Sequence, residues 1–93
     1  MSYKFISVGF VTTRAAHETF TEFEIAMCLN RHFCGDWGDL TIRDKKSNED
    51  ALKSGDRILS AYNIRNERMW IITDAANDFG VREYTTVLLP SDY

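Results

Sequence analysis

The C-terminal part of the chain limits the fold most tightly, because it holds three short segments rich in strand-forming residues. These segments are 57–64 (RILSAYNI), 68–75 (RMWIITDA) and 82–90 (REYTTVLLP), and a short RNE turn joins the first two. Such segments, separated by turn residues, are typical of antiparallel strands that follow one another along the chain. We therefore predict that residues 57–90 form a three-stranded meander.

One strand and two helices are expected before this meander. Residues 4–12 (KFISVGFVT) are rich in β-formers and predict a strand. Residues 42–54 (IRDKKSNEDALKS) predict a polar helix that begins after Thr41 and ends at the glycine cap Gly55. Residues 17–33 (HETFTEFEIAMCLNRHF) predict an amphipathic helix.

The spacing of apolar residues along 17–33 predicts which side of this helix faces the core. Thr19 and Glu22 match a capping box, so the helix can begin as late as Phe20. Ile25 and Leu29 fall off the main apolar side, as its margin or as an exposed patch. The predicted core-facing side follows three-and-four spacing through Ala16, Phe20, Phe23, Met27 and Cys34.

The order of these elements predicts one α+β domain over residues 1–93, with the topology β-α-α-β-β-β. Two helices are expected to pack on one face of a mostly antiparallel four-stranded sheet. A chain of 93 residues has room for a single domain.

Charge and composition narrow the function classes. The net charge is −3, which is too weak for a strong DNA mimic. The chain also lacks the basic surface that a general nucleic-acid binder needs. The first residues, MSYKFISVGF, do not resemble a signal peptide. No stretch approaches the roughly 18 apolar residues of a transmembrane helix. We expect a cytoplasmic protein with no membrane partner.

The segment CGDWGDL, residues 34–40, reads mainly as a tight corner between the two helices. Gly35 stands where a left-handed cap residue is expected, and Asp39 can cap the next helix. Trp37 is expected to be buried where the helices meet the sheet. Asp36 is the residue that this structural reading explains least, so it is a candidate partner contact.

This corner also carries a resemblance. The motifs GDWGDL and TTVLLPSDY, with DKKSNEDALKSGDRILSAY and MWIITDA between them, resemble a family of small proteins found in phages, plasmids and integrated mobile elements. These are usually called plasmid-related proteins, or are labelled as a type I restriction subunit. The resemblance covers residues 31–93 and implies no established activity. The matching positions are Gly35, Asp36, Trp37, Gly38, Asp39, Leu40, Asp44, Lys45, Asn48, Glu49, Trp70, Thr85 and Thr86.

Two features depart from what this resemblance suggests. The family generally has a shorter turn where this chain has residues 74–83, so we expect an insertion in that loop. The restriction-subunit label finds no support in the residues, because the chain has no glycine-rich cofactor loop after a strand. A chain of 93 residues also cannot hold a methyltransferase domain.

Catalytic and metal sites are not favoured. Cys28, His32 and Cys34 match no standard zinc spacing, and His17 would have to fold back to join them. In a reducing compartment both cysteines are expected to be free thiols. A triad of Cys34, His32 and Asp36 is disfavoured, because residues two apart on a helix point in different directions. We expect no enzyme, no cofactor and no metal.

The remaining interpretation is a non-enzymatic accessory protein of a mobile element that acts by binding a host or element-encoded protein. Small proteins of this kind often inhibit host defence complexes, as anti-CRISPR or anti-restriction proteins do. The candidate partner-binding residues are Asp36, Trp37, Asp39, Ile25 and Leu29. The alternative is a nucleic-acid-binding regulator with an arginine and aromatic hairpin, formed by Arg57, Arg65, Arg68 and Tyr62 beside Trp70.

Overall fold

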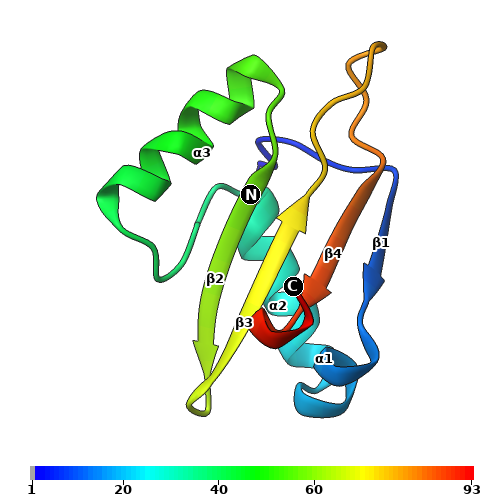
Figure 1. The fold of residues 1–93 in the computed structure, drawn as a ribbon, viewed down its shortest axis with the longest axis vertical. Helices are drawn as coiled ribbons and strands as arrows, with labels where there is room; N and C mark the ends of the chain where they lie inside the picture. Colours follow the sequence, from blue (N-terminus) through cyan, green and yellow to red (C-terminus); the bar gives the residue numbers. More distant parts are fainter. Residues whose placement is uncertain (1) are drawn as a thin grey trace.

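A mixed four-stranded sheet organises the structure, a computed structural model that describes residues 2–93 (Figure 1). The strands β2 (Ile58–Ile64), β3 (Glu67–Thr73) and β4 (Tyr84–Leu88) form the predicted antiparallel meander. The first strand, β1 (Gly9–Thr12), adds to the outside of β4 in parallel, so the order across the sheet is β1-β4-β3-β2. The α+β class predicted from the sequence is confirmed.

The first strand is shorter than the 4–12 segment expected from its composition. Its ladder with β4 begins at Gly9, which pairs with Tyr84. Residues before it make isolated backbone hydrogen bonds and no ladder: the Lys4 amide donates to the Phe33 carbonyl at 2.8 Å and the Val8 amide to the Arg82 carbonyl at 3.0 Å. Strand-forming composition alone therefore overestimated β1, because its partner β4 begins only at Tyr84 and offers no ladder to the residues before Gly9.

The helix expected over 17–33 is two helices. The helix α1 (Arg14–Thr19) ends at Phe20, whose backbone is extended, and α2 (Glu22–Phe33) then begins afresh. The capping box is formed by Thr21 and Glu24 and not by Thr19 and Glu22: the Glu24 amide donates to Thr21 Oγ1 at 3.1 Å, and the Thr21 amide to Glu24 Oε1 at 2.9 Å.

This break shifts the phase of the buried side. The side chains of α2 that face the sheet follow the spacing 25, 28, 32 and 33, with Ile25, Cys28, His32 and Phe33 buried. Phe23 and Met27 were expected in the core and are exposed. Ile25 was expected outside it but is only 8% exposed, and Leu29 packs against the same core. A lysine at Ile25 would therefore damage the fold.

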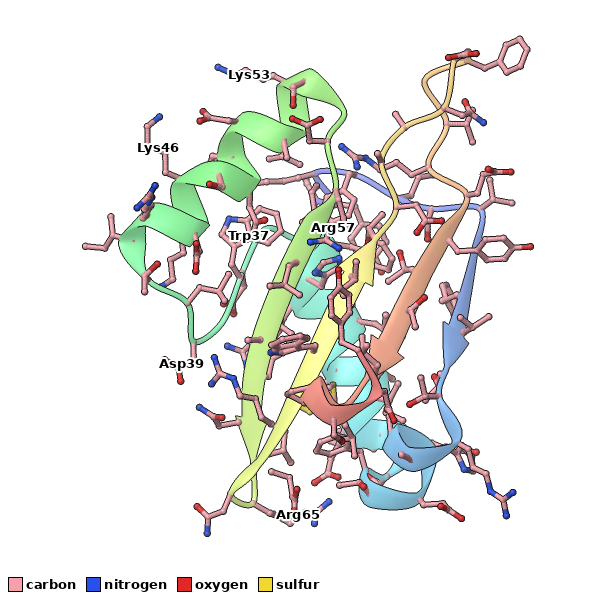
Figure 2. The ribbon with its side chains drawn as sticks, in the orientation of Figure 1. Trp37, Asp39, Lys46, Lys53, Arg57 and Arg65 are labelled. Atoms are coloured by element: carbon pink, nitrogen blue, oxygen red, sulfur yellow. The ribbon has the colours of Figure 1, made fainter. Side chains whose placement is uncertain are left out.

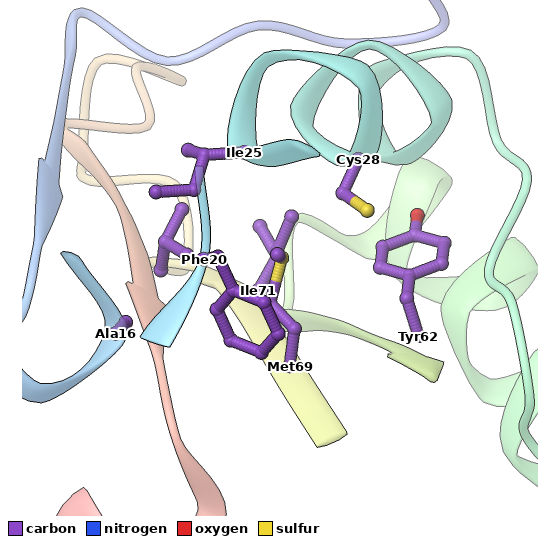
Figure 3. Packing of buried hydrophobic residues seen from close by; sticks show 8 residues of the cluster. Ala16, Phe20, Ile25, Cys28, Tyr62, Met69 and Ile71 are labelled. Carbon is purple, nitrogen blue, oxygen red and sulfur yellow. The ribbon is translucent and has the colours of Figure 1, made fainter. Parts of the chain in front are cut away.

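The core lies between α2 and the inner face of the sheet. Figure 3 shows the aromatic ring of Phe20 beside Met69 and Ile71, with Ile25 and Cys28 entering from the helix above them. A second cluster joins Trp37, Ala51 and Ile58 near the top of β2. The two clusters together cover the length of the sheet.

The other helices occupy different places. The helix α3 (Ile42–Ser54) lies beside β2 and not flat on the face that α2 covers (Figure 1). The 3-10 helix η1 (Pro90–Asp92) lies on the face opposite α2, where Tyr93 meets Trp70 edge to face at 5.8 Å between ring centroids. Within residues 2–93 no helix is both long and apolar enough to cross a membrane.

Candidate functional site

The corner at residues 34–40 buries its tryptophan, as the sequence predicted. Trp37 is 4% exposed and packs with Ala51 and Ile58, with its ring tilted against Phe5. Its indole nitrogen donates to Glu49 Oε2 at 2.7 Å, which ties the corner to α3. Figure 2 shows Trp37 pointing inward between the upper part of β2 and α3. In the folded chain, Trp37 is a core residue.

The two aspartates of the corner both have internal partners. Asp36 accepts from Arg31 Nε at 2.7 Å and from Nη2 at 3.3 Å, and this guanidinium lowers the pKa of Asp36 below its ordinary value. Asp39 accepts from Arg68 at 3.1 Å and from Asn63 at 2.7 Å, and Arg68 is the main cause of its lowered pKa. Both carboxylates remain at the surface, but each already neutralises an arginine.

The corner also closes one edge of the sheet. Gly38 forms a parallel bridge with Ala61, whose amide donates to the Trp37 carbonyl at 3.2 Å and whose carbonyl accepts from the Asp39 amide at 2.7 Å. Gly38 has φ +76°, and a Cβ there would lie 2.0 Å from the Ala61 carbonyl oxygen. The position therefore requires glycine because of both its backbone angle and its close approach to β2.

Asn48 of α3 extends this closure by one step along β2. Its side-chain amide donates to the Leu59 carbonyl at 2.7 Å, while its side-chain oxygen accepts from the Leu59 amide at 3.2 Å. An asparagine side chain here replaces a neighbouring strand. Sequence reasoning missed this role, since nothing in a polar helix distinguishes an asparagine that reaches a strand from one that faces water.

The three arginines of the predicted nucleic-acid hairpin do not form one surface. Figure 2 shows Arg57 near the start of β2 and Arg65 at the hairpin turn, at opposite ends of the strand. Arg65 is held by Glu24 at 2.7 Å and Arg68 by Asp39 at 3.1 Å, while Arg57 contacts the Tyr93 ring. The aromatic residue expected beside them, Tyr62, is buried and donates to the Asp36 carbonyl at 2.6 Å.

A chain of hydrogen bonds crosses the core beneath α2. His32 Nδ1 lies 2.6 Å from Ser60 Oγ, and His32 Nε2 lies 2.8 Å from Thr73 Oγ1. Thr73 continues to Thr85 at 2.7 Å, and Thr85 to Ser7 at 2.7 Å. Desolvation lowers the pKa of His32 to about 3, so the imidazole is neutral in the folded protein.

The same contacts bear on the metal site and the catalytic triad that were considered from the sequence. Both ring nitrogens of His32 are engaged with hydroxyl groups, and Cys28 is buried with a raised pKa because its thiol is desolvated. Cys34 is the C-cap of α2 and is partly exposed. Among residues 2–93, no group of three or more histidine, cysteine or carboxylate side chains is arranged to hold a metal ion.

An uncovered apolar surface lies at the other edge of the sheet, along β1 and the loop that precedes β4. Three shallow grooves share its side chains. Val8 and Val81 line two of these grooves, and Ile6 lines one of these two and also the third groove. Most of the exposed large hydrophobic side chains of the described chain belong to it. We call this the β1-side surface; its members are Tyr3, Ile6, Val8, Phe10, Val11, Phe79, Val81 and Tyr84.

The loop 74–83 rises beyond the end of the sheet (Figure 1). Its Phe79 side chain is 89% exposed. Asn77 organises its tip: the side-chain oxygen accepts from the Phe79 amide at 2.9 Å and from the Val81 amide at 3.0 Å. The Asn77 amide also donates to the Val81 carbonyl at 2.9 Å. The sequence predicted an insertion in this loop but did not single out Phe79, although a phenylalanine between Asn-Asp and Gly is an unusual place for an aromatic side chain.

Arg82 fixes the base of this loop. Its guanidinium donates to the carbonyls of Asp56 at 2.7 Å, Asp74 at 3.0 Å and Ala51 at 2.9 Å. The Ala51 carbonyl belongs to the last turn of α3, where the helix dipole favours a positive charge. Burial lowers the pKa of Arg82 from its ordinary value.

Replacing Trp37 by alanine is expected to lower the free energy of unfolding by about 3–5 kcal/mol, because a fully packed indole leaves a cavity. Trp37→Phe keeps an aromatic ring and loses the bond to Glu49, so its cost should be smaller, about 1–2 kcal/mol. Urea denaturation of both variants measures this order. Equal stability of Trp37→Ala and the parent protein would contradict the packing described above.

Stability is expected to fall by about 1.5–2 kcal/mol between pH 6.5 and pH 5, because the unfolded chain protonates His32 while the folded chain does not. The pKa of His32 is lower in the folded state, so stability is lost as pH falls below the ordinary value of 6.5. Urea titrations at several pH values measure this. A flat profile for the parent would contradict a neutral, buried His32.

Treatment with a chelator is expected to leave the thermal midpoint unchanged, since the described residues include no clustered metal ligands. Elemental analysis of the purified protein checks the same point. Stoichiometric zinc, or a large loss of stability with chelator, would contradict this prediction and show a metal site in the protein.

No protein-family model, curated protein or solved structure matches this chain. The corner that drew attention in the sequence is used internally, since Asp36, Trp37 and Asp39 bond to neighbouring residues. Most of the exposed large hydrophobic side chains of residues 2–93 lie on the β1-side surface, and Phe79 is its most exposed member.

Proposed function

We propose that this protein is a non-enzymatic accessory protein that acts by binding another protein, with Phe79 as its anchor. The observation that carries this proposal is an aromatic side chain, 89% exposed, at the tip of a loop that is hydrogen-bonded internally. Leaving such a side chain in water is unfavourable, and burying it in a partner's pocket recovers that free energy. Aromatic anchors of this kind dominate the energetics of many protein interfaces.

The loop is held in place before any partner arrives. Asn77 fixes its tip, and the Ala76 amide donates to the Gly55 carbonyl at 2.8 Å, which ties the ascending side to the end of α3. Arg82 fixes the descending side. A preorganised loop loses little conformational entropy when it binds, so more of the contact energy of Phe79 contributes to affinity.

Charges around the loop indicate what the partner should look like. Asp74, Asp78 and Glu83 are exposed, whereas the guanidinium of Arg82 is turned inward onto carbonyl groups. The charged side chains that the loop itself exposes are therefore all acidic. A partner with an apolar pocket rimmed by lysine or arginine fits this surface, because complementary charge speeds association and excludes other partners.

The resemblance of residues 31–93 to small phage and plasmid proteins supports a role in a mobile element. Proteins of host defence complexes, such as CRISPR or restriction assemblies, are the partner class that this context favours. The loop 74–83 is the segment in which this chain departs from the resembling proteins. A partner recognised through Phe79 would accordingly be particular to this chain and its close relatives.

The proposal also accounts for the weakness of the nucleic-acid alternative. Arg65 and Arg68 already pair with Glu24 and Asp39, and Tyr62 has no exposed face on which a base could stack. Binding to nucleic acid would require these ion pairs to open. The acidic loop would also repel a phosphate backbone.

Affinity capture from lysates of a bacterial host, compared between variants, tests this function. Phe79→Lys is expected to reduce recovery of a stoichiometric partner at least about tenfold, in the range of anchor residues at interfaces. Phe23→Lys is the matched control, because Phe23 is another exposed phenylalanine, 71% exposed, far from the loop in sequence. It should leave recovery unchanged.

Other outcomes of the capture are equally informative. Recovery that is the same for Phe79→Lys as for the parent would show that the loop is not the anchor. Recovery that disappears after nuclease treatment, and after charge reversal of Arg57, Arg65 and Arg68, would instead support the nucleic-acid function. Circular dichroism of each variant confirms that the fold is intact.

A further inference from the structure

The two edges of the sheet are treated in opposite ways. Along β2, the outward backbone groups of Leu59 are bonded by the Asn48 side chain, and those of Ala61 by the backbone of Trp37 and Asp39. Along β1, no strand or helix among residues 2–93 takes this place (Figure 1). Proteins usually protect an open edge with charges, proline or a covering segment.

The register of β1 with β4 identifies which groups of the open edge are free. The Gly9 amide donates to the Glu83 carbonyl at 3.0 Å and the Thr13 amide to the Val87 carbonyl at 2.9 Å. Since alternate residues of a strand direct their amide and carbonyl to opposite sides, Phe10 and Thr12 direct theirs away from the sheet. None of residues 2–93 bonds to them.

We propose that the open edge of β1 pairs with β1 of a second copy of this chain. The two strands would be antiparallel, and the two-fold axis would pass between the two Val11 residues. In this register Phe10 stands opposite Thr12 of the second copy, and Thr12 opposite its Phe10. The amide and carbonyl groups that are free in each copy are then all paired with those of the other. The two residues with outward groups are spaced as an isologous antiparallel contact requires.

The side chains of the edge suit this occupant. Residues 5–13 (FISVGFVTT) contain no ionisable group, so the pairing opposes no like charges. On one face Val11, which is 49% exposed, meets Val11 of the second copy. On the other face the exposed Phe10 covers Thr12 of the second copy. The net charge of −3 adds little repulsion between the copies.

Dimerisation goes beyond the proposed binding by Phe79 and does not depend on it. It would join two four-stranded sheets into one continuous sheet with no open β1 edge. The loop 74–83 lies at the end where β1 begins, so the two-fold axis would place the two loops at opposite ends of the assembly (Figure 1). The dimer would present two Phe79 anchors, and a partner with repeated sites would bind it with increased avidity.

Sedimentation equilibrium of the full chain across a range of concentrations tests the dimer, with substitutions on the proposed axis. The parent protein is expected to reach twice the monomer mass. Val11→Lys and Val11→Glu should each weaken the dimer at least about tenfold, because like charges would meet on the axis. An equimolar mixture of the two variants should recover the dimer, because lysine then faces glutamate.

Two controls separate a lost interface from a damaged fold. The first control is Phe23→Lys, which also replaces an exposed apolar residue and should leave the dimer unchanged. The second control is the thermal midpoint of every monomeric variant, which should stay close to that of the isolated parent monomer. In the parent, the Phe10 and Thr12 amides should exchange hydrogen more slowly as concentration rises. A parent that stays monomeric at millimolar concentration, a Val11→Lys dimer of parent affinity, or variants that fail to pair when mixed would overturn the proposal, whatever the Phe79 capture shows.

Discussion

The pairing of the 37–39 segment with Ala61 is the contact on which the rest of the structure depends. It brings the corner against β2 so closely that only glycine fits at position 38. Because the backbone is held there, Trp37 is carried into the core and Asp39 is carried toward Arg68. The corner therefore serves three purposes at once: it turns the chain between α2 and α3, it fills the upper core, and it satisfies backbone groups that a terminal strand would otherwise leave in water.

Much of the fold could be predicted because its signals are local. Alternating strand residues and turn chemistry placed the meander, and Thr41 and Gly55 bounded α3 where the structure has it. The helical region 14–33 could not be divided correctly, since Thr19-Glu22 and Thr21-Glu24 are both acceptable capping pairs. Only the packing of Phe20 into the core selects the second pair, and that choice then sets which side of α2 is buried.

The candidate site was less predictable, because exposure is a property of the whole fold. The candidate residues selected from the sequence are charged or aromatic. Such side chains also form ion pairs and packing contacts within a fold, and this is how the protein uses them. Asp36 and Asp39 hold arginines, and Tyr62 is closed beneath Arg31, whose guanidinium lies 4.5 Å from the ring centre. The β1-side surface combines apolar residues from segments about seventy positions apart. A local sequence pattern cannot show that these residues stay exposed in the fold.

The asymmetry between the two sheet edges connects stability with function. The β2 edge is closed by the 37–39 segment, which requires glycine at position 38, and by the Asn48 side chain. The β1 edge, in contrast, carries neither a charge nor a proline that would protect it. An unprotected apolar edge promotes uncontrolled association unless its pairing is satisfied in a defined way. A short strand with outward groups at only Phe10 and Thr12 limits how far such pairing can extend, and a two-fold contact uses all of them. The same shortness would keep the association weak, so that the concentration of the protein would decide how many Phe79 anchors it presents together.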